Sequence, residues 1–127
     1  MKKRNLFANL YFFGDREESN VRGKLASLFG CTFDDAYAKT DEDGSTTWFD
    51  QAFGFQLLFQ MESLRDDGAW YLVTLSPVLD VFDSDSEMEE INFHVAQMLR
   101  GAGFDPVATL EEYRSQHYRP APAQADA

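Results

Sequence analysis

The chain has 127 residues, 44% of them hydrophobic and 15% aromatic, which is enough for one domain with a substantial hydrophobic core. Its formal net charge of −11 opposes binding to nucleic acid phosphates and to anionic membrane surfaces. Cys31 is the only cysteine, so an internal disulfide and a multi-cysteine metal or redox site are excluded. These properties predict a cytoplasmic protein with one globular domain at residues 1–119.

The N-terminal segment predicts a strand and lacks the features of a leader peptide. Asn5, Asn9 and Asp15 interrupt its short apolar run, whereas a membrane span needs about 20 apolar residues and a signal peptide needs a longer uninterrupted apolar region. Residues 6–13 are apolar and aromatic and end at Gly14, as expected for a strand that is buried on both faces.

The residues after Gly14 predict a helix that ends at Gly30. Asp15 and Glu18 have the spacing of a capping box, and Gly30 stands where a left-handed C-terminal cap belongs. The apolar residues at helical spacing are Val21, Leu25, Leu28 and Phe29.

A β-hairpin is the clearest signal in the middle of the chain. Acidic residues and Gly44 break the pattern between Thr32 and Thr47, which predicts a loop around a short strand near residues 36–39. The following strand has alternating residues over 53–61, its partner covers 70–75, and residues 65–68 supply a turn of sequence Arg-Asp-Asp-Gly.

The last third predicts an acidic loop at residues 80–85 and a helix at 87–100. Ser86 and Glu89 have capping-box spacing, and Gly101 or Gly103 can end the helix. Its apolar stripe consists of Met88, Ile91, Val95, Met98 and Leu99. A short edge strand at 104–108 and a helix capped by Thr109 and Glu112 follow, and residues 120–127 form a disordered tail. The whole pattern predicts an α+β fold, a mainly antiparallel sheet with helices packed on one side.

No catalytic, cofactor or metal site is predicted. Cys31 with His94 or His117 is the one possible thiol arrangement, but the C-terminal end of the preceding helix should raise the pKa of Cys31. Residues 83–87 imitate the start of a calcium loop, yet Met88 and His94 occupy the positions that require glycine and glutamate. Residues 41–44 have the composition of a turn, and no zinc pattern or phosphate-binding loop is present.

The central segment resembles a known group of proteins. The residues concerned are a helix that ends in Phe29-Gly30, the segment Trp48-Phe49-Asp50, the strand Phe53-Gly54-Phe55-Gln56-Leu57-Leu58-Phe59 and the strand Gly68-Ala69-Trp70-Tyr71-Leu72-Val73. Over residues 21–75, this pattern resembles small immunity proteins of bacterial contact-dependent growth inhibition systems. The resemblance implies a cytoplasmic antidote that binds and blocks a toxin domain, often a nuclease.

The charge independently favours a protein partner. A toxin that acts on RNA or DNA needs a cationic cleft, and an acidic partner associates with such a cleft faster through electrostatic steering. We therefore expect a monomer that forms a heterodimer with a cognate basic toxin and does not bind nucleic acid or membranes. The residues expected to contact the partner are Asp41, Glu42, Asp43, Asp80, Phe82, Asp83 and Asp85.

Two other functions are compatible with the sequence. An adaptor or secretion chaperone would form a stable dimer and expose an apolar groove. A small carboxylate-dependent enzyme would have a concave pocket with two acids of perturbed pKa, and a sequence with 22 Asp and Glu residues gives no way to identify such a pair.

Overall fold

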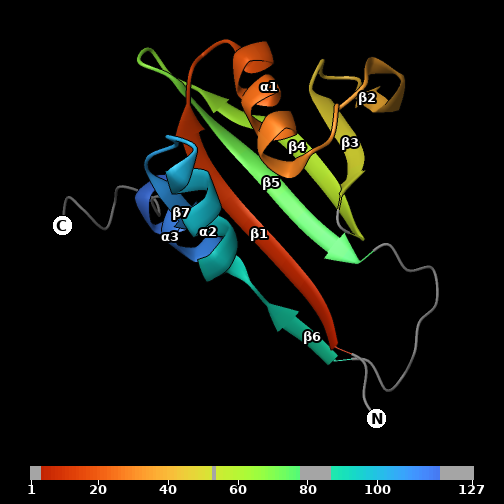
Figure 1. Cartoon of the computed structure of the whole chain (residues 1–127). Helices are drawn as coiled ribbons and strands as arrows, with labels where there is room; N and C mark the ends of the chain where they lie inside the picture. Colours follow the sequence, from red (N-terminus) through yellow and green to blue (C-terminus); the bar gives the residue numbers. More distant parts are fainter. Residues whose placement is uncertain (1–3, 53, 78–86, 118–127) are drawn as a thin grey trace, which may run out of the picture.

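The computed structural model describes residues 4–52, 54–77 and 87–117 (Figure 1). The strands are β1 (Arg4–Gly14), β2 (Ala38–Thr40), β3 (Thr46–Ala52), β4 (Phe55–Leu64), β5 (Ala69–Pro77), β6 (Glu87–Glu90) and β7 (Val107–Thr109). The helices are α1 (Glu18–Phe29), α2 (Asn92–Gly101) and α3 (Leu110–His117), with a short 3₁₀ helix η1 (Asp35–Tyr37).

All seven strands belong to one sheet. The order is β2-β3-β4-β5-β1-β6, and β7 also pairs with β1 on its β6 side. Among the strand pairs of the described residues, only β1–β6 is parallel. The predicted α+β fold with a mainly antiparallel sheet is therefore confirmed.

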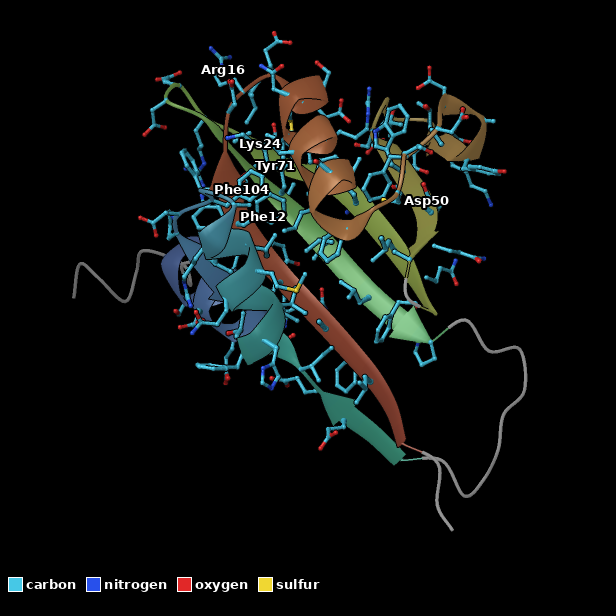
Figure 2. All side chains as sticks on the ribbon, in the orientation of Figure 1. Phe12, Arg16, Lys24, Asp50, Tyr71 and Phe104 are labelled. Atoms are coloured by element: carbon cyan, nitrogen blue, oxygen red, sulfur yellow. The ribbon has the colours of Figure 1, made fainter. Side chains whose placement is uncertain are left out.

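The main core lies between one sheet face and the helices α1 and α2, which cover that face in Figure 1. Successive strand residues point to opposite faces, so Leu10 and Phe12 of β1 enter this core while Tyr11 points away. Figure 2 shows Phe12, Tyr71 and Phe104 close together there. The Tyr71 hydroxyl donates a hydrogen bond to the Asp15 backbone carbonyl, so this buried polar group is satisfied.

A smaller cluster lies on the opposite face, where α3 packs. Tyr113 of α3 stacks on Tyr11 with ring centroids 4.2 Å apart, and Trp70 meets the Tyr113 ring edge-on at 5.3 Å. Thus α1 and α2 lie on one side, as predicted, and α3 adds a short cover to one end of the other side.

Two helix ends follow the predicted chemistry. Gly30 adopts the left-handed conformation with φ 71° and closes α1. At α3, the Thr109 amide donates to the Glu112 carboxylate at 2.8 Å, and the Glu112 amide donates to the Thr109 hydroxyl at 3.2 Å. The capping box predicted for this helix is confirmed.

The capping box predicted for α1 is not formed. The helix begins at Glu18, one residue after Glu17, whose side chain makes no cap. The Asp15 carboxylate instead accepts hydrogen bonds from the Glu17 amide at 3.1 Å and the Asn20 side chain at 3.3 Å. Asp15 therefore stabilises the approach to the helix.

The helix predicted at residues 87–100 is wrong over its first turn. Glu87–Glu90 form β6, which pairs with residues 4–7 of β1, and the Ile91 amide donates to the Phe7 carbonyl at 2.8 Å. The predicted capping box of Ser86 and Glu89 falls partly outside the described residues, and α2 starts at Asn92. The hydrogen bonds that residues 4–7 of β1 form with this segment outweigh its local helical pattern.

The hairpin region contains one strand more than predicted. β3 pairs with β4 as well as with β2, and Gly54 lies in the β3–β4 turn with φ 81° rather than inside a strand. Phe53 lies outside the described residues. The predicted β4–β5 hairpin and its turn at residues 65–68 are confirmed.

Candidate protein-binding edge

Five exposed acidic residues lie at the β2 end of the sheet, and we call them the acidic edge. They come from two neighbouring segments of the chain, η1 with its N-cap and the β2–β3 turn, and they are Asp34, Asp35, Asp41, Glu42 and Asp43. Lys39 of β2 is the one basic residue within residues 34–43. Asp34 and Asp35 thus precede the edge strand β2, and the predicted Asp41, Glu42 and Asp43 follow it.

Local hydrogen bonds fix the shape of this edge. Asp34 caps η1 by accepting a hydrogen bond from the Ala36 amide at 2.9 Å. In the β2–β3 turn, the Asp43 carboxylate accepts one from the Ser45 amide at 3.0 Å, and Gly44 adopts φ 91°. Asp34 and Asp43 therefore have a structural role in addition to their charge.

Tyr37 is a large exposed aromatic residue at the end of η1, two positions after Asp35. Its side chain is 61% exposed, although most large apolar side chains of the described residues are covered. Tyr37 also lines a shallow hollow of about 330 Å³ together with Phe49, Asp50, Gln51 and Gln56. The hollow joins the acidic edge to the surface of β3 and β4.

Asp50 anchors the loop that follows α1. Its carboxylate accepts hydrogen bonds from the amides of Thr32 at 2.9 Å and Phe33 at 2.8 Å, and it lies on β3 in Figure 2. Partial burial raises the pKa of Asp50, but the amide hydrogen bonds from Gln51, Thr32 and Phe33 outweigh burial and lower it below the ordinary value. Asp50 is therefore a carboxylate at neutral pH, with a role in holding buried Phe33 at φ 47°.

Cys31 is a poor nucleophile in this setting. Burial, and then the negative charge of Asp50, raise the pKa of the thiol from 9.0 to about 11. The predicted direction is confirmed, but the causes are desolvation and a carboxylate rather than the helix end. His94 is exposed on α2, where its ring meets Phe93 edge-on, and the His117 side chain lies outside the described part of the structure.

The raised pKa predicts slow alkylation of Cys31 in the folded chain. Iodoacetamide reacts with the thiolate, so the rate should rise with pH toward a midpoint near 11. The urea-unfolded chain should reach its midpoint near the ordinary cysteine value, and Asp50→Asn should shift the folded profile downward. The raised pKa also means that Cys31 favours the folded state below pH 9 and that this contribution is lost as the pH rises through 11. Identical profiles for folded and unfolded chains would contradict this account.

Most of the remaining carboxylates of the described residues form two other groups, and Glu62 and Asp105 are two further exposed acids. One lies where the β1–α1 loop meets the β4–β5 turn, and its acids Asp15, Glu17, Glu18, Asp66 and Asp67 are accompanied by Arg16, Arg22 and Arg65. The other lies around α2, β6 and α3, where Glu89, Glu90, Glu111 and Glu112 are accompanied by Arg100 and Arg114. Negative charge is thus distributed over three regions, and the acidic edge has the fewest bases.

Four of the predicted contact residues cannot be placed. Asp80, Phe82, Asp83 and Asp85 lie outside the described residues. Sequence reasoning also missed Tyr37, and the available signal was an aromatic residue two positions after the Asp34-Asp35 pair.

The described part of the chain has no group of three or more His, Cys, Asp and Glu side chains arranged to hold a metal ion. Within the same ranges, every helix is too short or too polar to cross a bilayer. No family model, curated protein or solved structure matches this chain.

Proposed function

We propose that this chain is a non-enzymatic, cytoplasmic binding protein that neutralises a basic toxin domain by docking on it through the acidic edge. The observation that carries the proposal is the presence of five exposed carboxylates within residues 34–43 at the edge strand of the sheet, together with exposed Tyr37 and with Lys39 as the one base in that segment. The resemblance of residues 21–75 to contact-dependent growth inhibition immunity proteins supports the same function.

The physical basis is electrostatic steering combined with an aromatic anchor. A negative surface raises the rate of encounter with a cationic partner by about 10-fold to 1000-fold at low salt. Tyrosine is frequent among the residues that dominate binding energy, because its ring contributes large area and its hydroxyl retains a polar contact. The acidic edge together with Tyr37, which lies between its two segments in the chain, has both properties, whereas the other two acidic groups contain more arginines.

The carboxylates favour binding over acid–base catalysis. Asp15 and Asp50 have pKa values below the ordinary one, because hydrogen bonds to their charged forms outweigh burial. Such acids are ionised at neutral pH, whereas a general acid needs a raised pKa. Among the described residues, no charged side chain is buried.

The proposal predicts that the gene immediately upstream encodes a secreted protein that ends in a basic toxin domain. Co-expression of this chain should restore growth to cells that produce that domain, and the purified pair should form a 1:1 complex. A metabolic operon at that position, or a basic domain that does not bind, would overturn the proposal. A stable homodimer of the isolated chain in sedimentation would favour the adaptor or chaperone alternative.

Charge reversal should locate the contact on the acidic edge. The triple variant Asp35→Lys, Asp41→Lys and Glu42→Lys retains the turn-stabilising Asp34 and Asp43, and it should slow association with the basic domain by about 10-fold or more at low salt. Stopped-flow fluorescence would measure the rate.

The matched control reverses three exposed acids outside the acidic edge, in the variant Glu17→Lys, Asp66→Lys and Glu111→Lys. It changes the net charge by the same amount, so its association rate should fall much less. Equal losses in the two variants would show that the partner responds to net charge alone and would remove the acidic edge from the proposal.

A further inference from the structure

On the sheet face opposite α1 and α2, the outward positions nearest the middle of β3, β4 and β5 carry no charge. Glu62 of β4 and Lys39 of β2 are charged residues at the borders of this region. Leu57, Phe59, Val73 and Leu75 point into the main core, so the residues between them point outward. The outward side chains form three rows across the paired strands. One row is Gln51, Gln56 and Ser76, the next is Phe49, Leu58, Thr74 and Asn9, and the third is Thr47, Gln60 and Leu72. We call these ten residues the uncharged face. None of them is charged, although 26% of the residues in the chain are charged.

The part of this face over β3 and β4 is not covered by a described helix. Phe49 and Leu58 are directly opposed in the β3–β4 register, and both are half-buried. Neither belongs to the main core or to the cluster under α3, which takes up only Leu72 from this face. The Lys39 ammonium lies 5.9 Å from the centroid of the Phe49 ring, so this apolar pair has one cation beside it on a sheet surface that no described helix covers.

Polar side chains around this pair are already ordered by hydrogen bonds. The Thr47 hydroxyl donates to the Gln60 side-chain oxygen at 2.9 Å, and the Gln60 amide donates to Glu62 at 2.6 Å. The Thr74 hydroxyl donates to the Asn9 side-chain oxygen at 3.2 Å. A partner would meet a preorganised surface, which lowers the entropy lost on binding.

The uncharged face and the acidic edge are continuous. The hollow of about 330 Å³ is lined by Tyr37, which lies between the two segments of the acidic edge in the chain, by Phe49, Gln51 and Gln56 of the face, and by Asp50. Protein interfaces commonly have a centre depleted of charge and a polar rim that remains accessible to solvent. The two surfaces have this arrangement relative to each other.

We propose that the uncharged face is the centre of the interface with a cationic protein and that the acidic edge is part of its rim. This inference rests on the proposed function and names the surface that gives the complex its affinity. Charge complementarity selects the occupant, because a second copy of a chain with net charge −11 would be repelled by the same acidic rim. Phosphate-rich nucleic acid and anionic lipid would be repelled in the same way.

Charge insertion at Gln56 tests this proposal. Gln56 is exposed on β4, so both Gln56→Glu and Gln56→Lys should fold, which thermal unfolding followed by circular dichroism would verify. At the centre of an interface either charge would be buried without a partner, so both variants should weaken binding of the upstream-encoded basic domain about 10-fold or more. Calorimetry at physiological salt would give the dissociation constants.

The matched controls are Ser27→Glu and Ser27→Lys, at an exposed position of α1 on the other side of the sheet. They report the effect of charge at a distance, so glutamate should tighten binding slightly and lysine should weaken it slightly. If the Gln56 variants show this opposite-sign pattern or no change, the uncharged face is not the interface, although the proposed function stands.

Two further outcomes separate the proposals. If the wild-type chain does not bind the basic domain at all, the proposed function fails and this inference fails with it. If the isolated chain self-associates and Gln56→Glu dissolves the oligomer, the occupant of the face is a second copy and the inference is overturned.

Discussion

Replacing Phe12 with alanine is expected to lower the free energy of unfolding by about 3–5 kcal/mol. Phe12 is fully buried, and its ring lies 4.7 Å from that of Phe104 and 5.7 Å from that of Tyr71, measured between centroids. It connects the central strand β1 to the core beneath α1 and α2 (Figure 2). The loss combines the transfer of the ring to water with a cavity that the surrounding rings cannot fill.

Urea unfolding would measure this loss, with Phe93→Ala as the control. Phe93 is 68% exposed on α2, so its removal should change stability by no more than about 0.5 kcal/mol. A Phe12→Ala variant as stable as the Phe93→Ala variant would contradict the placement of the core.

Adding one methyl group at Gly68 is expected to cost about 1–3 kcal/mol. A Cβ atom there would lie 2.4 Å from the Phe13 ring and 2.6 Å from the Gly14 carbonyl oxygen. The ring could rotate away, but the backbone carbonyl belongs to the paired strands β1 and β5, so the turn itself must shift. The free energy of unfolding in urea should fall accordingly.

The same substitution at Gly23 should have the opposite sign. Gly23 lies exposed inside α1, and apart from its chain neighbours and the backbone of its own helix no atom lies within 4 Å of the position a Cβ would take. Alanine there should therefore stabilise the chain by up to about 1 kcal/mol through helix propensity. If Gly68→Ala were as stable as Gly23→Ala, β5 would not approach β1 as described.

Sequence reasoning identified the features of the fold that depend on nearby residues. The left-handed Gly30, the Thr109–Glu112 capping box and the β4–β5 hairpin all arise from contacts within a few positions along the chain. β6 could not be predicted in this way, because its hydrogen-bonding partner is β1, about 80 residues earlier. The glutamate-rich sequence of β6 suits the start of a helix equally well. The choice of strand over helix depends on pairing with β1.

The site was predicted only where it coincides with a turn. Asp41, Glu42 and Asp43 were recognisable because Gly44 follows them and predicts an exposed loop. The uncharged face depends on the register of β3 against β4, which opposes Phe49 to Leu58. Because β3 was not predicted as a strand, the outward position of Phe49 could not be assigned from the sequence. The hollow lined by Tyr37 and Phe49 could not be predicted for the same reason.

The salt dependence of association tests the central claim most directly, because the claim is that negative charge on the acidic edge guides a cationic protein to this chain. The measurement compares association rates with the upstream-encoded basic domain between about 50 and 300 mM salt, where screening lengths shorten through the relevant range. We predict a steep fall for the wild-type chain and a nearly flat profile for the Asp35→Lys, Asp41→Lys and Glu42→Lys variant. Equal slopes for the two chains would contradict the claim.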